Sequence, residues 1–485
     1  MRTLPLALML LVTLAFLLHP VSAQSTRPFL RVASFLTANL TETLVSGFER
    51  SYNVSVNVIY PDTIQELNHS SFDVILADTA EPLQNLTPYL ARITISGYPK
   101  GFPDGIKGEC TVCFGGRIYA FAQTELGIMV NDAYLSQYGL PVPATYNNLG
   151  NQIYEGHLIL ANPETSTTML RFITALIGQL GWTRGWETLK NMTVNSGVFA
   201  LSSLDAANYV AEGKYGVTVT TADRAIPYIE AGLPVTFVYP RNQTFASLAY
   251  VGVWNGATDN PSALEFLNYT LSIGGQSLVA LGNTGYAPLS FAAYANLTVS
   301  EALAAQGVVP ALADSSLAYY NQSLERFDPL ILALFDSVVY YNMNSLERAW
   351  NQIAQAEELY RLSVQVFGRS QFTTENLAIL NSSLRDFYYL PPVAVTPNWT
   401  TLILIEGPDS QEIELTWERA AFAMYQDSYS NATHVQSPLN QLILNNELDL
   451  KIIELEIAGL SAVFSLVMVL FYHAFYIVPK LKREK

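Results

Sequence analysis

The chain has 485 residues, half of them hydrophobic, and a formal net charge of −16. This length exceeds one ordinary domain and allows a sizeable buried core. The acidic balance and the lack of a basic run exclude a nucleic-acid-binding function, because phosphates need basic side chains to neutralise them.

The first 23 residues predict a secretory signal peptide. Arg2 precedes an apolar core from Leu4 to Leu18, and Val21–Ala23 is a small-residue cleavage site before Gln24. No cysteine follows that site, which excludes a lipid anchor there. We therefore expect the mature chain outside the cell.

Residues 30–79 predict strands that alternate with a helix, which is the pattern of a parallel sheet. The predicted strands are Leu30–Ser34, Val54–Val58 and Phe72–Ala77, and Leu40, Leu44 and Phe48 mark the helix between the first two. Ligands bind beyond the carboxyl ends of parallel strands. We therefore expect solute contacts from Ser34, Phe35, Asp78 and Thr79, with a helix or turn cap as the alternative role of Asp78.

Cys110 and Cys113 are the only cysteines of the chain. Outside the cell, a structural disulfide that closes a tight loop is the simplest interpretation. A redox pair and half of a metal site are the alternatives, but no second Cys/His pair supports zinc. We predict a disulfide, with no metal and no other cofactor.

Tyr119–Asn131 is an apolar run that predicts a crossing into a second lobe. The polar pair Thr124-Glu125 interrupts this run, and both residues are candidate solute contacts. The next candidate is Leu158–Phe172, which predicts a buried strand over Leu158–Ala161, a turn at Asn162-Pro163 and a helix. Three hydroxyls, Ser166, Thr167 and Thr168, lie where that helix begins. Free N–H groups and the positive dipole end there suit an anionic or polyoxygenated solute, with ordinary N-capping as the alternative.

The chain then predicts the remaining strands of both lobes. Tyr215–Thr221 is a strand that ends near Asp223, and Phe237–Pro240, with Tyr239, is the crossing back. Ala249–Trp254 predicts a strand and Pro261–Leu271 a helix. Asp223 and Tyr239 complete the candidate solute contacts.

Seven segments occur in a characteristic order: Gly127–Asn131, Tyr138–Thr145, Tyr154–Ser166, Ala211–Val217, Val251–Asn260, Ala263–Gln276 and Tyr286–Leu289. Together, over about Leu30 to Leu289, they resemble the type 2 periplasmic binding proteins. The pattern is most similar to the ferric-iron, thiamine and aminoethylphosphonate group. Iron-binding members have adjacent tyrosines where this chain has Thr220–Arg224, which argues against iron as the solute.

The resemblance implies an α/β fold of two lobes that close by a hinge around a small solute and deliver it to an ABC permease. On this basis lobe 1 comprises 24–123 and 237–300, and lobe 2 comprises 124–236. No nucleophile–base set indicates an enzyme. A surface sensory or structural glycoprotein with the same fold is the alternative function.

Residues 301–456 lie beyond the resemblance and predict a mainly helical extension or stalk. Leu346, Trp350, Ile353, Tyr360 and Phe367 indicate a long amphipathic helix. Thr401–Ile405 predicts a strand, and Leu444, Leu448, Ile452 and Leu455 have heptad-like spacing. A stalk, a permease-docking module and a self-association surface are the open alternatives.

Ile457–Val478 is an apolar run long enough to span a bilayer as one transmembrane helix. Lys480, Lys482, Arg483 and Lys485 follow it, so residues 479–485 are expected in the cytoplasm and the rest outside, attached to the cell membrane.

Twelve Asn-x-Ser/Thr sequons lie between the two apolar segments and agree with this orientation. Glycosylation together with a protein anchor suggests an archaeal surface. The predicted acceptors are Asn39, Asn53, Asn68, Asn85, Asn191, Asn242, Asn268, Asn296, Asn321, Asn381, Asn398 and Asn431.

Overall fold

The computed structural model describes residues 28–61, 66–67, 72–95, 105–106, 108–240, 242–282, 284–290, 292–295, 318, 322–367 and 371–445. The predicted signal peptide, the predicted transmembrane segment and the sequons at Asn68, Asn296 and Asn321 lie outside these residues. Among the described helices, none combines the length and the apolar character needed to cross a membrane.

The chain divides into two compact units, and the first division falls within one long strand after Leu126. Unit 1 takes residues up to Leu126, Thr221–Leu233 and Thr244–Ala318, and unit 2 takes the rest. Residues of the C-terminal extension therefore group with unit 2, and Asp223 groups with unit 1.

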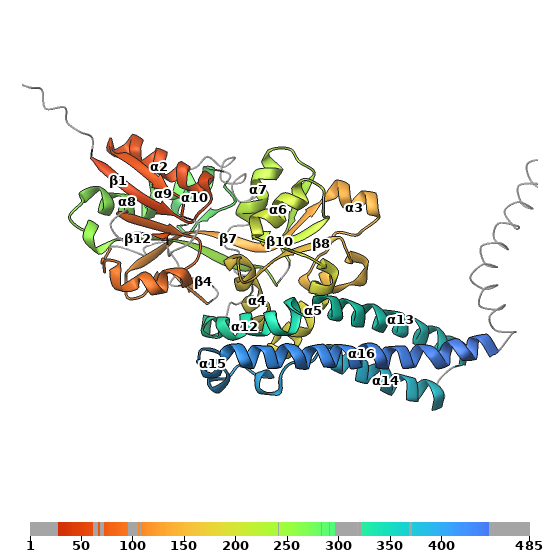
Figure 1. Cartoon of the computed structure of the whole chain (residues 1–485). Helices are drawn as coiled ribbons and strands as arrows, with labels where there is room; N and C mark the ends of the chain where they lie inside the picture. The colour runs from red at the N-terminus through yellow and green to blue at the C-terminus, as the bar shows by residue number, and fades with distance from the viewer. Residues whose placement is uncertain are drawn as a thin grey trace, which may run out of the picture. The chain divides into compact units, whose positions relative to one another are not determined.

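Unit 1 is an α/β layer whose sheet has the order β2-β1-β3-β12-β7. The strands β1 and β2, and β1 and β3, are parallel, whereas β12 is antiparallel to both of its neighbours. Phe48 of α2 and Phe266 of α8 contact each other, with ring centroids 5.1 Å apart, and both belong to the hydrophobic core that includes the sheet residues. Figure 1 shows these helices beside the strands of unit 1. The elements are β1 Phe29–Ser34, α2 Ala38–Tyr52, β2 Ser55–Ile59, β3 Val74–Ala77, η2 Glu81–Tyr89, β4 Gly105–Ile106, β5 Glu109–Cys110, β6 Val112–Cys113, α7 Ala222–Glu230, β12 Phe245–Val253, α8 Pro261–Leu271, α9 Ile273–Leu281, β13 Ala287–Pro288 and α10 Ala292–Ala295.

Unit 2 contains the second α/β layer. The strand β7, Ile118–Asn131, contributes its C-terminal half to this layer, and β10, β8 and β9 follow in that order. The elements are α3 Asp132–Tyr138, β8 Leu158–Ala161, α4 Thr167–Leu180, α5 Trp182–Ser196, β9 Phe199–Ala200, α6 Ser203–Ala211, β10 Val217–Thr221 and β11 Val235–Val238. The predicted strand Leu158–Ala161 and, in unit 1, the predicted helix Pro261–Leu271 are confirmed with the same bounds.

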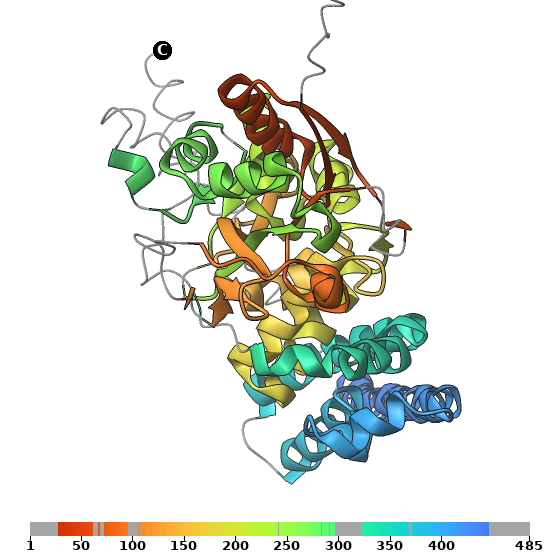
Figure 2. The ribbon, with the colours of Figure 1, turned by 90° about the vertical axis from the view of Figure 1, so that its left-hand side faces the viewer.

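The extension in unit 2 is helical, and α13, α14 and α16 run side by side in Figure 1 and are seen nearly end-on in Figure 2. The predicted long helix is confirmed as α13. Thr401–Ile405 is not a strand but lies in α15, because the side chain of Asn398 accepts the N–H of Thr401 at 2.8 Å and starts a helix. The elements are η6 Gln322–Phe327, α12 Asp328–Phe335, the π-helical turn η7 Asp336–Tyr340, α13 Met343–Phe367, α14 Gln371–Phe387, α15 Trp399–Ile405 and α16 Ser410–Asn445.

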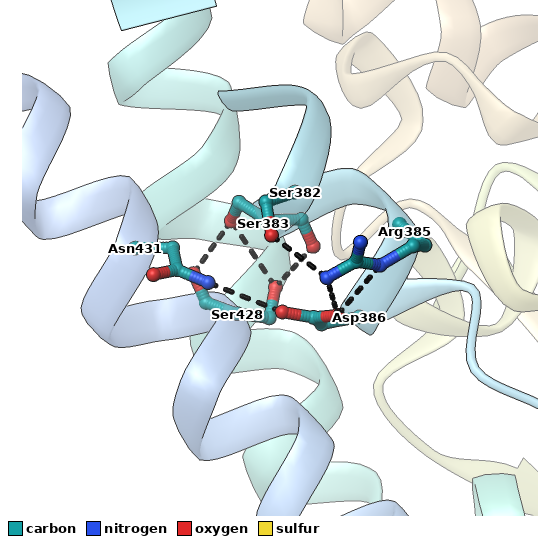
Figure 3. Close-up of polar contacts among 6 residues, drawn as sticks. All are labelled: Ser382, Ser383, Arg385, Asp386, Ser428 and Asn431. Atoms are coloured by element: carbon teal, nitrogen blue, oxygen red, sulfur yellow. Dashed lines mark hydrogen bonds and ion pairs between the residues drawn. The ribbon is translucent and has the colours of Figure 1, made fainter. Parts of the chain in front are cut away.

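Polar contacts hold α14 against α16 within this bundle (Figure 3). Ser383 Oγ donates to the carbonyl of Ser428 at 2.5 Å, and Ser428 Oγ donates to the carbonyl of Ser383 at 2.8 Å. Asn431 donates to Asp386 at 3.1 Å one turn further along. Both serines are fully buried, so small side chains here allow a close approach of the two helices.

Candidate functional site

The first predicted contact, Ser34, ends β1 and is buried. Its hydroxyl lies 2.7 Å from Thr41 Oγ1 and accepts the N–H of Leu36 at 3.2 Å. These two contacts fix the turn between β1 and α2. Phe35, the next residue, is half-buried against the core of unit 1.

Asp78 and Thr79 directly follow β3, as predicted for the carboxyl end of a parallel strand. Asp78 is half-buried, and its backbone carbonyl accepts a hydrogen bond from Ser247 Oγ at 3.1 Å. Thr79 is buried, and its hydroxyl has no hydrogen-bond partner among the described residues. A buried hydroxyl without a partner is costly, so this position favours a polar group that arrives with a ligand.

Thr124 and Asp223 are predicted contacts 99 residues apart, and the structure brings them together in unit 1. Thr124 Oγ1 accepts the N–H of Asp223 at 3.2 Å and lies 3.4 Å from Asp223 Oδ1. Gly285, at φ +77°, packs against them: a Cβ there would lie 2.3 Å from Asp223 Cα. Glycine at this position is therefore required to hold Asp223 in place.

Arg224 is a candidate that the sequence analysis missed. Its Nε lies 3.5 Å from Asp223 Oδ2, and its side chain is only 18% exposed. Burial opposes the charged form of Arg224, but Asp223, Tyr286 and Asp78 outweigh it and raise its pKa. Arg224 therefore stays a cation in a mostly buried place, beside the two carboxylates predicted to contact solute.

Glu125 lies beside Thr124 on β7, but successive residues of a strand point to opposite faces. Its side chain is 1% exposed, and one carboxyl oxygen accepts a hydrogen bond from Gln123 Nε2 at 2.6 Å. Burial raises the pKa of Glu125 to about 8, despite the opposing hydrogen bond from Gln123. Glu125 is thus a protonated acid in the core of unit 1 at neutral pH.

In unit 2, Ser166 is the N-cap of α4, and its hydroxyl accepts the N–H of Met169 at 3.3 Å. Ser166 is buried, Thr168 is half-buried and Thr167 is exposed. The neighbouring parallel strand β9 leads into α6, whose N-cap Ser202 accepts the N–H of Asp205 at 3.0 Å. Two helix N-termini therefore begin at the same edge of this sheet.

The remaining predicted contact is Tyr239, which follows β11 in unit 2 and packs on Phe237 with ring centroids 4.8 Å apart. The eleven candidate contacts thus fall into two sets. Unit 1 holds Ser34, Phe35, Asp78, Thr79, Thr124, Glu125 and Asp223, and unit 2 holds Ser166, Thr167, Thr168 and Tyr239.

The predicted disulfide is confirmed: Cys110 and Cys113 are bonded. Tyr250 Oη donates to the carbonyl of Cys110 at 2.9 Å and ties the loop to β12. Within the described part of the chain, no three His, Cys, Asp or Glu side chains are grouped as a metal ion would require.

Nine of the twelve predicted sequon asparagines are described. Three of them are half-buried with side-chain hydrogen bonds: Asn191 accepts from Tyr388, Asn398 caps α15, and Asn431 donates to Asp386. A glycan on these three would have to displace the contacts. The exposed acceptors are Asn39, Asn53, Asn85, Asn242, Asn268 and Asn381.

Comparison with known proteins adds independent information. Residues 83–305 match the family model described as bacterial extracellular solute-binding protein. The chain is similar to the phosphoglycerate transport regulatory protein PgtC of Salmonella typhimurium, with 26% identity over 294 residues that cover 60% of this chain and 70% of the relative. It is 22% identical over 253 residues to an uncharacterised protein of Haemophilus influenzae, covering 49% of this chain and 71% of the relative.

Among solved structures, the chain is similar to the periplasmic binding protein AfuA from Actinobacillus pleuropneumoniae, solved with exogenous fructose-6-phosphate bound. The TM-score is 0.52 at 20% identity, and the likeness covers 62% of this chain and 93% of the other. This likeness concerns the fold, which is the two-lobed α/β fold that the motif order predicted.

Proposed function

We propose that this chain captures a small phosphorylated solute for an ABC importer. The premise is that residues 83–305 belong to the bacterial extracellular solute-binding proteins of the type 2 periplasmic fold. The observation that carries the proposal is the cluster of Asp78, Thr124, Asp223 and Arg224 in unit 1: Asp78 follows β3, Thr124 lies within β7, and Asp223 and Arg224 lie in the first turn of α7, after the end of β10. Asp78, Asp223 and Arg224 follow the carboxyl ends of strands, which is where solutes bind in open α/β sheets.

The chemistry of this cluster suits a solute that carries both phosphate and hydroxyl groups. A guanidinium group can bind phosphate through two parallel hydrogen bonds, and Arg224 keeps its charge while mostly buried. Carboxylates such as Asp78 accept hydrogen bonds from hydroxyls. The names of the relatives support this class: one is named a phosphoglycerate transport regulatory protein, and the other was solved with fructose-6-phosphate bound.

A thermal-shift screen of the full chain tests the solute class, because a ligand that binds only the folded state raises the melting temperature. The panel contains 3-phosphoglycerate, fructose 6-phosphate, inorganic phosphate, thiamine, an aminoethylphosphonate and ferric citrate. We expect the phosphorylated organic compounds to give the largest shifts. A shift with thiamine or ferric citrate alone would refute the proposed solute class.

Arg224→Gln tests the residue that carries the proposal. We expect at least a tenfold loss of affinity for the phosphorylated solute, because the variant removes a charge-assisted bidentate contact. Arg361→Gln is the control, because Arg361 is an exposed arginine of α13 that pairs with Glu358. If both variants bind as the wild type does, Arg224 does not contact the solute.

The membrane anchor and the partner permease are further parts of the proposal. They are supported by the apolar run Ile457–Val478 and its cationic tail, and by the family match. Hinge closure stays a prediction, which small-angle scattering with and without saturating solute measures as a change in the radius of gyration. A sensory or structural surface protein remains the alternative. It would bind solute without neighbouring genes for a permease and an ATPase.

A further inference from the structure

Large apolar side chains are exposed together at the end of the helical extension where α15 leads into α16 (Figure 1). Single exposed apolar residues are ordinary on a protein surface, whereas a group of them on one segment marks an interaction surface. The members are each 42–65% exposed and form what we call the α15 patch: Val393, Val395, Trp399, Ile403 and Leu404.

Hydrogen bonds hold the turn before α15 against the first turn of that helix. Asn398 Nδ2 donates to the carbonyls of Val393 at 3.1 Å and Thr396 at 3.0 Å, and Thr401 Oγ1 donates to the carbonyl of Val393 at 2.6 Å. The two halves of the α15 patch therefore lie side by side. Because the Asn398 amide is used in these contacts, a glycan at this sequon would break the turn, and we expect the patch to stay bare.

Other side chains of the same segment already supply its core contacts. Ala394, Leu402 and Ile405 are buried, and the carbonyl of Ala394 accepts the indole N–H of Trp182 at 2.8 Å. The helix α15 packs on α12 and on α16. The fold of unit 2 therefore does not need the side chains of the α15 patch, which leaves them available to a partner.

The composition of this surface indicates the kind of partner. No charged residue occurs between Asp386 and Glu406 in the sequence. Charged groups border the patch: Glu406 is exposed directly after α15, and the guanidinium of Arg326, also exposed, lies 4.8 Å from the ring centroid of Trp399. An apolar centre with few charges and a polar rim is typical of the interface between two copies of one chain.

The position of the α15 patch relative to the proposed anchor favours the same partner. The helix α16, Ser410–Asn445, begins beside α15 and is about 54 Å long. The apolar run that we propose as the anchor begins at Ile457, beyond its other end. Every anchored copy thus has the same length of chain between patch and membrane. Confinement to one membrane raises the effective concentration of copies, and identical surfaces suit an isologous pair.

We propose that the α15 patch pairs with the same patch of a second copy of this chain about a twofold axis. In such a pair, residues near the axis meet their own counterparts. The argument from the tether rests on the membrane anchor of the proposed function, whereas the composition and exposure of the patch do not. None of the patch residues is a candidate solute contact, so solute capture does not enter the proposal.

Disulfide crosslinking in membranes of cells that express the full chain tests the pairing. Cys110 and Cys113 are bonded to each other, so the wild type contributes no free thiol. Thr400→Cys places one thiol at an exposed position of α15, and Gln355→Cys, at an exposed position of α13, is the control. On mild oxidation we expect at least fivefold more covalent dimer from Thr400→Cys than from Gln355→Cys.

A second substitution locates the contact. Ile403→Glu puts a charge into the α15 patch at a side chain that is 65% exposed, so the fold should be kept. Combined with Thr400→Cys, it should reduce the dimer at least fivefold. Leu201→Glu is the matched control, because Leu201 is 74% exposed between β9 and α6, and it should leave the dimer unchanged. Equal melting temperatures of the two glutamate variants confirm that both are folded.

Equal crosslinking of Thr400→Cys and Gln355→Cys would overturn the proposal, and so would a dimer that Ile403→Glu does not reduce. A crosslinked product with a mass other than that of the dimer would show that a different protein covers the patch. A thiol that forms no dimer and resists a water-soluble maleimide would show that lipid covers it. Either result contradicts the proposal. Fractionation of the same cells reports the anchor separately, so failure of the anchor is distinguishable from failure of the pairing.

Discussion

At the scale of single residues, Glu125 is the clearest case of an environment that changes a side chain's chemistry. The carboxyl group is buried in the core of unit 1 with Gln123 as its hydrogen-bond partner, and its second oxygen has none among the described residues. Its pKa rises from 4.5 to about 8. The folded protein therefore takes up a proton at Glu125 that the unfolded chain releases above about pH 4.5.

This difference predicts a pH dependence of stability. Because the folded-state pKa is the higher one, the contribution of Glu125 is fully present below about pH 4.5 and is lost as the pH rises to about 8. Glu125→Gln should remove this slope and make the protein more stable than the wild type at pH 8. Urea unfolding at pH 5, 6, 7 and 8 measures it, and parallel curves for the two proteins would contradict the assignment.

Residue identity alone indicated part of the unit 1 cluster. The strand pattern placed Asp78 and Asp223 beyond strand ends, and the structure confirms these positions. The strand pattern could not indicate the pairing of Thr124 with Asp223, since the two residues are 99 positions apart in the sequence and meet only in the folded sheet. Arg224 was missed because an arginine beside an aspartate on a helix is usually a surface pair, and its burial depends on tertiary packing.

At the scale of elements, helix termini and one buried lysine fix the geometry of unit 2. Lys190 of α5 is fully buried, and its Nζ donates to the carbonyls of Phe387 at 3.1 Å and Tyr389 at 2.6 Å. It also lies 5.0 Å from the ring centroid of Tyr425, and burial lowers its pKa well below the usual value. One side chain thus joins the α/β layer to the end of α14 and to α16.

Lys190→Met should loosen this junction. The variant keeps a long apolar stem but leaves two buried carbonyls without a donor, which costs about 1–3 kcal/mol each. Hydrogen exchange should accelerate at the C-terminal end of α14 and in α16. Lys214→Met, at an exposed lysine paired with Glu212, is the control. Exchange rates that stay unchanged in Lys190→Met would show that packing alone holds the bundle.

Ser166→Ala separates capping from solute binding. Loss of the cap on α4 typically costs about 1 kcal/mol of stability. If Ser166 also contacts solute, affinity should fall about tenfold, since about 1.4 kcal/mol corresponds to that factor. Ser272→Ala, which removes the N-cap of α9 in unit 1, is the matched control. Equal loss of stability in both variants with wild-type affinity would assign Ser166 to capping only.

The elements of both α/β layers were predictable because the positions of proline and glycine and the spacing of hydrophobic residues indicate the same helix and strand boundaries there. Leu158–Ala161 and Pro261–Leu271 show this, with breakers at or beside their ends. Thr401–Ile405 failed because its β-branched residues favour a strand, whereas the Asn398 cap and the burial of Leu402 and Ile405 against the bundle favour a helix. An apolar run of this length is too short for its hydrophobic periodicity to distinguish a strand from a helix.

At the scale of the whole molecule, the chain combines two α/β layers, whose residues 83–305 match a family model of solute-binding proteins, with a helical extension that groups with unit 2. The resemblance ends near Leu289, so the sequence did not indicate what the extension packs against. Thr174 of α4 donates to Asp328 at 2.7 Å, and Trp182 of α5 donates to the carbonyl of Ala394 at 2.8 Å. These contacts hold the described part of the extension against the α/β layer of unit 2.

Truncation before Ile457 tests the proposed anchor. If the apolar run is the membrane attachment, the truncated protein should appear in the medium and keep the solute affinity of the full chain. Fractionation of cells that express each form measures this. Recovery of the truncated protein only with membranes would refute the anchor, and the solute proposal would be unaffected.

The most direct test of the central claim is a calorimetric titration of the full chain with a phosphorylated solute and with its dephosphorylated counterpart. We expect 3-phosphoglycerate or fructose 6-phosphate to bind saturably at one site. Glycerate or fructose should bind at least tenfold more weakly, and Arg224→Gln should abolish the difference. Equal affinity for the phosphorylated and dephosphorylated compounds, or no binding of either pair, would contradict the proposal that this chain captures a phosphorylated solute.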